Sequence, residues 1–110
     1  MNKFESELER GNFVTSECSN CKEIVWPPSD FCSKCLGNVK WRDVLKNGKL
    51  LEFSIKDGKI FGIAEFENKI RVISTLKSSE IGEPKIGQDL ILENCGFKDG
   101  NYSFTSILAL

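Results

Sequence analysis

The chain has 110 residues, of which 40% are apolar and 28% charged, and its formal net charge is −1. This composition indicates a globular chain with a modest core, large enough for one domain or a small domain plus a metal module. It contains no histidine, which excludes Ser-His-Asp and Cys-His catalysis and histidine-ligated zinc.

Residues 3–10 predict a short helix, because Phe4 and Leu8 lie four residues apart on one face and Gly11 follows. A helix this short is unstable alone in water, so it must dock either on its own chain or on another protein. The first ten residues carry three glutamates and no apolar stretch, unlike a signal peptide. We therefore expect a cytoplasmic protein whose thiols stay reduced, and the chain has no apolar run of membrane-spanning length.

Two Cys-x-x-Cys pairs follow the helix, with ten residues between them: Cys18 with Cys21, and Cys32 with Cys35. This spacing predicts a tetrahedral four-thiolate site, with zinc as the expected ion and iron as the alternative. Because protein side chains fill all four positions, we expect a structural site and not a catalytic one. The fifth cysteine, Cys95, has no histidine to activate it, and we expect a small core residue there.

The loop between the cysteine pairs contains Pro27-Pro28, which predicts an extended turn. Trp26 stands just before this turn and is expected to cover the metal module. Trp41 is expected to close the module and join it to the following segment.

From Gly48 onward the pattern changes to short strands. The predicted strands are 51–55, 60–66, 70–76, 88–95 and 102–108, with Leu51, Phe53 and Ile55 expected on one face of the first. Asp57-Gly58 and Asp99-Gly100 predict tight hairpins, and Gly62 is a candidate bulge. Residues 77–86 predict a long connection or a short helix. Five strands with one long connection favour an OB-type Greek-key barrel, and a five-stranded sandwich or SH3-like barrel is the alternative.

The strands carry no catalytic carboxylate pair, Gly-rich phosphate loop or nucleophile motif, so we do not expect an enzyme. Basic residues outnumber acidic ones six to three between residues 22 and 49. An ordinary solvated surface explains this excess, and a nucleic-acid contact is the alternative. Most aromatic residues alternate as core residues would, which leaves few stacking platforms for bases.

The order of helix, four-cysteine ribbon and small barrel resembles a known family, the acyl-CoA-associated OB-fold proteins with a rubredoxin-like zinc ribbon. The double proline between the two cysteine pairs is the most specific matching element. The chain departs from the family where Lys22 replaces a usual glycine, Ser29 a usual arginine and Ser33 a usual proline. The matching residues are Phe4, Leu8, Gly11, Phe13, Cys18-Ser19-Asn20-Cys21, Trp26-Pro27-Pro28, Cys32-Ser33-Lys34-Cys35, Trp41, Gly48, Ile63-Ala64-Glu65-Phe66, Ile86-Gly87 and Phe104.

The resemblance implies a mainly β chain with a docking helix over 1–12, a zinc ribbon over 13–44 and a five-stranded OB-fold barrel over 45–110. It implies a non-catalytic scaffold for a thiolase-superfamily acyl-CoA enzyme, such as acetyl-CoA acetyltransferase with HMG-CoA synthase. The ion would be structural Zn²⁺, and the barrel would sit beside the path of CoA. Phe4, Leu8 and Trp26 are the candidate partner contacts. A single-stranded nucleic-acid-binding protein is the alternative function, since zinc ribbons and OB folds also serve that role.

Overall fold

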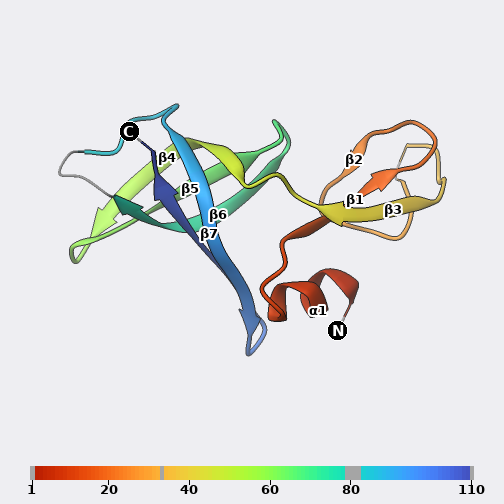
Figure 1. Ribbon diagram of the computed structural model, residues 1–110, viewed down its shortest axis with the longest axis horizontal. Helices are drawn as coiled ribbons and strands as arrows, with labels where there is room; N and C mark the ends of the chain where they lie inside the picture. The colour runs from red at the N-terminus through yellow and green to blue at the C-terminus, as the bar shows by residue number, and fades with distance from the viewer. Residues whose placement is uncertain (1, 33, 79–82, 110) are drawn as a thin grey trace.

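The computed structural model describes residues 2–32, 34–78 and 83–109. The molecule is elongated, 46 × 29 × 17 Å, with a barrel at one end, a small sheet at the other and a helix below their junction (Figure 1). This mainly β architecture confirms the predicted fold class. Its elements are α1 (Lys3–Glu9), β1 (Val14–Cys18), β2 (Ile24–Val25), β3 (Val39–Asp43), β4 (Asn47–Lys56), β5 (Lys59–Phe66), β6 (Ile70–Ser78), β7 (Asp89–Lys98) and β8 (Asn101–Leu108).

The N-terminal helix α1 begins with a capping box. The Asn2 side chain accepts a hydrogen bond from the Glu5 N–H at 2.8 Å, and the Glu5 carboxylate accepts one from the Asn2 N–H at 3.2 Å. Phe4 and Leu8 face inward as their spacing predicts, at 8% and 0% exposure. The helix packs against β7 and β1, so it docks on its own chain.

The zinc ribbon is built on a three-stranded antiparallel sheet in the order β2-β1-β3. The central strand β1 pairs with β3 from Val14 opposite Asp43 to Cys18 opposite Val39. Its apolar cluster is small and consists of Cys18, Val25 and Cys32, with Val39 packed against them. A cluster of this size buries too little apolar surface to fold the segment without help.

The five C-terminal strands close into a barrel in the order β4-β5-β6-β8-β7, with β7 pairing back to β4. Neighbouring strands are antiparallel except β6 and β8, which run parallel from Thr75 opposite Thr105 to Ser78 opposite Leu108. A closed five-stranded ring that inserts its last strand between the third and fourth has the Greek-key order of an OB fold. The sandwich alternative is therefore wrong.

The first two barrel strands correct three expectations: the inward faces of Leu51 and Ile55, and the bulge at Gly62. Leu50, at 0% exposure, points into the core instead of Leu51, because β4 has a bulge between Leu50 and Glu52. Gly62 lies on the opposite strand and is not itself the bulge. A Cβ there would come within 2.1 Å of the Glu52 carbonyl oxygen, so the close approach requires glycine. Ile55, predicted to face the core, is 57% exposed near the hairpin end.

Both predicted hairpins are confirmed. Asp57 and Gly58 have φ of 52° and 77°, and Asp99 and Gly100 have 53° and 78°, the signs that a type I′ turn requires. Strand β7 continues three residues past the predicted end at Cys95, because it stays paired with β8 up to this turn. The predicted 77–86 connection begins after Ser78, and its residues 79–82 lie outside the described part of the chain.

One continuous apolar core joins the helix, the start of the ribbon and the barrel. Phe13, which is 5% exposed and immediately precedes β1, lies at its centre. Its ring centroid is 6.1 Å from that of Trp26, 5.6 Å from that of Phe66 and 5.0 Å from that of Phe104. Because these rings come from the ribbon and from two barrel strands, Phe13 ties the two units together.

Candidate metal centre and adjoining groove

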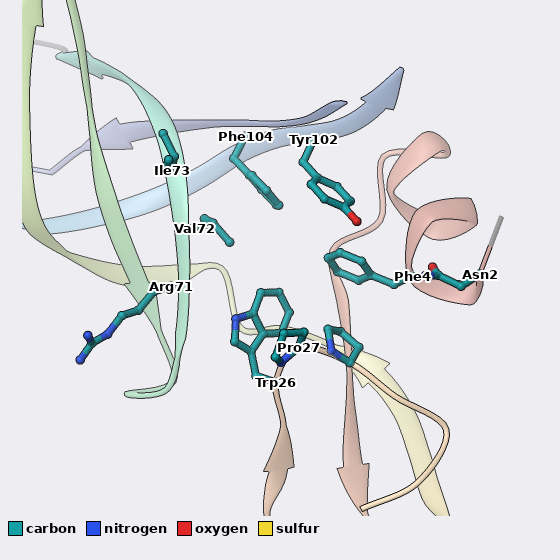
Figure 2. Close-up of a pocket in the computed structure, with 10 residues that line it drawn as sticks. Asn2, Phe4, Trp26, Pro27, Arg71, Val72, Ile73, Tyr102 and Phe104 are labelled. Atoms are coloured by element: carbon teal, nitrogen blue, oxygen red, sulfur yellow. The ribbon is translucent and has the colours of Figure 1, made fainter. Parts of the chain in front are cut away.

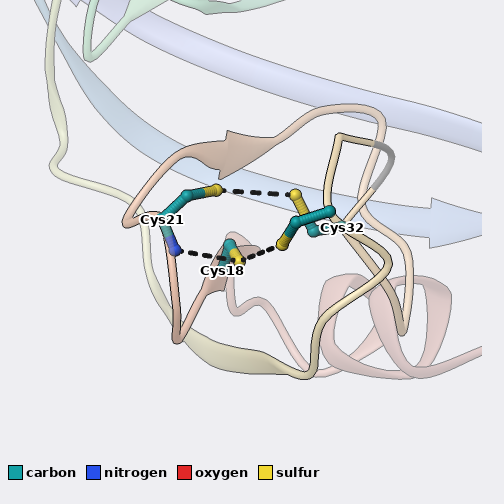
Figure 3. A group of neighbouring side chains, drawn as sticks. Cys18, Cys21 and Cys32 are labelled. Carbon is teal, nitrogen blue, oxygen red and sulfur yellow. Dashed lines mark hydrogen bonds between the residues drawn. The ribbon is translucent and has the colours of Figure 1, made fainter.

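The four predicted cysteine ligands converge at one end of the ribbon. Their sulfur atoms all lie within 4.8 Å of one another. The Cys18 and Cys35 sulfurs are 3.4 Å apart, and those of Cys21 and Cys32 are 3.7 Å apart (Figure 3). Four thiolates held about 2.3 Å from a tetrahedral zinc lie about 3.8 Å from one another, so the donor set fits that ion.

Two similar backbone turns present these sulfurs. In the first, the Lys22 N–H donates to the Cys18 carbonyl at 3.0 Å. In the second, the Leu36 N–H donates to the Cys32 carbonyl at 2.8 Å. Lys22 and Leu36 have φ of 63° and 58°, in the left-handed region that disfavours side chains larger than glycine. The departure from the family at Lys22 therefore places a lysine at a strained position.

Backbone hydrogen bonds prepare two of the thiols for ionisation. The Cys21 N–H donates to the Cys18 sulfur at 3.3 Å and lowers the pKa of Cys18 to about 6. The N–H groups of Cys35 and Lys34 lower the pKa of Cys32 in the same way.

The other two thiols are harder to ionise. At Cys21 and Cys35, backbone hydrogen bonds act to lower the pKa, but the neighbouring Cys18 thiol and burial outweigh them. The pKa of Cys21 rises to about 11 as a result. A cation between the four sulfurs would favour their ionised forms at neutral pH.

The site is a structural metal centre. It offers four sulfur ligands and no position that a substrate could occupy without displacing one of them. Gly37 allows the second turn to close, because a Cβ there would lie 3.1 Å from the Cys35 sulfur. The bound ion would cross-link the two turns and supply free energy that the small apolar cluster lacks.

The fifth cysteine lies away from this centre. Cys95 is half-buried on β7 and packs against the main core, as expected for a small core residue. Burial raises the pKa of its thiol, and Lys46 only partly opposes this effect. A thiol with a raised pKa is a poor nucleophile at neutral pH.

An apolar groove of about 500 Å³ lies where the helix, the ribbon and the barrel meet (Figure 2). Trp26 and Pro27 form its ribbon wall, while β6 and β8 form the opposite wall. The guanidinium of Arg71 points away from the aromatic rings and pairs with Glu65 at 2.9 Å. The lining residues are Asn2, Phe4, Trp26, Pro27, Pro28, Arg71, Val72, Ile73, Tyr102 and Phe104.

Two buried hydroxyls of β1 hold the ribbon wall of the groove. Thr15 Oγ1 donates to the Val25 carbonyl at 3.3 Å, just before the double proline. Ser16 Oγ accepts a hydrogen bond from the Ser29 N–H at 3.1 Å, just after it. The turn that carries Trp26 is thus fixed at both ends.

The three predicted partner contacts fall into two groups. Trp26 and the edge of Phe4 line the groove, and their ring centroids are 5.5 Å apart. Leu8 is fully buried, so a partner could reach it only if the helix left its own core. Partner binding by these residues stays a prediction.

The barrel wall of the groove was not predicted from the sequence. Ile73, Tyr102 and Phe104 come from strands that are distant in sequence, and only the barrel brings them together. One signal was present for Ile73: it is apolar, yet its position alternates with the core residues of its strand. It is indeed 76% exposed.

The fold and the four thiols define a zinc-ribbon OB-fold protein. Residues 6–39 match the family model zf-ChsH2, the rubredoxin-like zinc ribbon domain of ChsH2. No curated protein matches the chain by sequence. Within the described residues, no helix has the length and apolar character needed to cross a membrane.

Two solved structures share the fold. One, described as an Ltp2-ChsH2(DUF35) aldolase, has a TM-score of 0.76 and 14% identity, covering 100% of this chain and 98% of that one. The other, a DUF35-family protein of unknown function from Sulfolobus solfataricus, has a TM-score of 0.66 and 16% identity, covering 97% and 83%. Together with the ribbon match, they confirm the resemblance to proteins that join a rubredoxin-like zinc ribbon to an OB-fold barrel.

Proposed function

We propose that this chain is a non-catalytic accessory subunit of a thiolase-like acyl-CoA enzyme, located in the cytoplasm. The observation that carries the proposal is the likeness along the whole chain to the ChsH2(DUF35) protein seen with Ltp2. The closed four-thiol site supports a structural role for the metal, and zinc is the ion we expect.

The groove is the proposed contact surface. Ile73 and Tyr102 are 76% and 53% exposed at its edge, and Trp26 and Phe4 contribute apolar surface beside them. Exposed apolar patches bordered by polar residues are typical of protein contacts. A second enzyme of the HMG-CoA synthase type and a contact between the barrel and CoA remain part of the proposal.

The alternative of single-stranded nucleic-acid binding has less support. The net charge is −1, and Phe66 and Phe104 lie in the core at 0% and 6% exposure. Stacking on bases needs exposed rings beside a cationic track. Titration with oligonucleotides at low salt tests it, and tight, strongly salt-dependent binding would favour this alternative.

Co-expression with a thiolase-like enzyme from the same source tests the proposal. We expect the two chains to co-purify and Ile73→Asp to weaken binding by about 10-fold or more, because a carboxylate would be buried against apolar surface. Ile86→Asp is the matched control, since Ile86 is 71% exposed and lies outside the groove. If no such enzyme co-purifies, the proposal is wrong. If both variants bind equally well, the groove is not the contact surface.

A further inference from the structure

The junction of ribbon and barrel contains a charged cluster centred on Arg42. This residue lies on β3 of the ribbon and faces the turn between β5 and β6 of the barrel. Its Nη1 donates to Oε2 of Glu67 at 2.9 Å, and its Nη2 donates to Oε1 at 2.8 Å. Its Nε also donates to the Glu17 carboxylate of β1 at 3.3 Å. The guanidinium is therefore held in one orientation by both units.

This cluster is shielded from water more than the other ion pairs of the described chain. The side chains of Arg42 and Glu67 are 27% and 12% exposed. The Glu67 carboxylate also accepts a hydrogen bond from the Leu45 N–H at 3.0 Å, in the segment that links ribbon to barrel. Hydrogen bonding from Arg42 holds the pKa of Glu67 below its usual value, consistent with an ionised pair.

A second ion pair of opposite polarity supports the same turn. Lys69 of the barrel turn lies 3.5 Å from Glu23 of the ribbon, and their side chains are 41% and 46% exposed. Two residues further along the chain, Arg71 to Ile73 form the β6 part of the barrel wall of the groove. The turn at 67–69 is thus fixed by the ribbon and continues directly into that wall.

We propose that the Arg42–Glu67 pair is a lock that sets the angle between ribbon and barrel, and with it the width of the groove. Packing around Phe13 holds the two units together, but apolar packing is weakly directional. A bidentate pair between planar groups is directional, so it selects one angle among those that the packing allows. The functional consequence rests on the proposed function: a partner meets a groove already in its bound shape.

Residual dipolar couplings of the zinc-loaded chain test the lock without any partner. In the natural chain, one alignment tensor should fit the backbone amides of both units. In Glu67→Gln, which keeps the side-chain size and an acceptor for the Leu45 N–H, the two units should need different tensors. Lys77→Gln is the matched control, because it breaks the 2.9 Å Lys77–Glu93 pair within the barrel. One tensor should still fit that variant.

The lock is refuted if one tensor fits both units of Glu67→Gln. Arg42→Lys is a second variant, should Glu67→Gln fail to fold. Lysine keeps the positive charge but lacks the planar guanidinium. We therefore expect ribbon and barrel to need different alignment tensors in this variant too. A single tensor that fits both units of Arg42→Lys would also refute the lock.

Affinity for the partner enzyme separates this inference from the proposed function. If the locked angle falls to about one fifth of the population, binding should weaken about fivefold. Looser orientation with unchanged affinity would support the lock and refute the groove as the contact surface.

Discussion

The ribbon and the barrel reach stability by different physical routes. The barrel surrounds an apolar core that includes fully buried Leu50, Phe66 and Ile70. The ribbon has a cluster in which two of the three buried members, Cys18 and Cys32, are metal ligands. We therefore expect a bound ion to stabilise the ribbon as apolar burial stabilises the barrel.

The turns of both units use left-handed backbone positions. The barrel hairpins place Asp57-Gly58 and Asp99-Gly100 where φ is positive, and the turn after β5 places Glu67 and Asn68 there without glycine. The ribbon turns place Lys22 and Leu36 at comparable angles without glycine. A bound ion would hold Lys22 and Leu36 at these angles, because the free energy of metal binding exceeds a strain of about 1–2 kcal/mol per residue.

Removing the metal should have the largest effect, because the ribbon should unfold while the barrel stays folded. With a chelator, or in Cys32→Ser, we expect the amides of β1 to β3 to lose protection from hydrogen exchange while the barrel keeps its own. The physical reason is that structural zinc sites contribute on the order of 10 kcal/mol to folding. Metal analysis with amide exchange checks this, and Cys95→Ser should retain one ion per chain. A ribbon that keeps full protection without metal would contradict it.

The next largest effect is expected at Phe13, where the two units share one core. Phe13→Ala should lower the free energy of unfolding by about 3–5 kcal/mol, because a buried ring is lost and a cavity remains. Denaturant titration of the metal-loaded chain measures it. Phe31→Ala is the control, since Phe31 is 59% exposed and should change stability by no more than about 0.5 kcal/mol. Equal effects at both positions would mean that the rings around Phe13 do not join the units.

The smallest effect concerns the strained ribbon turns. Lys22→Gly should stabilise the metal-loaded ribbon by about 1 kcal/mol. The substitution relieves the strain of the left-handed backbone, and the greater freedom of glycine in the unfolded chain offsets part of this gain. Leu36→Gly should behave alike, because the second turn repeats the geometry of the first. Lys40→Gly, on strand β3, should destabilise instead. Competition with a chelator ranks the three variants by metal affinity. A loss of metal affinity in Lys22→Gly would show that the Lys22 side chain is needed at this turn.

Local patterns predicted most of the secondary structure. In the predicted strand 70–76, the alternate residues Ile70, Val72, Ser74 and Leu76 are all buried, while Ile73 is exposed. These predictions succeeded because strand periodicity and turn preferences depend on near neighbours along the chain. The bulge beside Leu50 was not predicted. It depends on a contact between strands, in which the carbonyl of Glu52 approaches Gly62 on the neighbouring strand.

At the candidate site, too, local features were predicted from the sequence and features that join distant segments were not. The four metal ligands were identified by spacing alone, because each pair of sulfurs is held within a single backbone turn. The groove was not identified, since its walls come from the helix, the loop around Trp26 and two barrel strands. The Arg42–Glu67 pair joins residues 25 positions apart, and neither position is distinctive in the sequence.

The sequence by itself thus determined the four metal-ligand cysteines, the succession of helix, ribbon and strands, and the tight turns, all of which depend on short-range geometry. Only the tertiary structure decided that the helix docks on its own chain, that Leu50 faces the core and that ribbon and barrel enclose a groove. These features depend on contacts between segments distant in sequence, where packing and directional ion pairs select one arrangement among many that the local patterns allow.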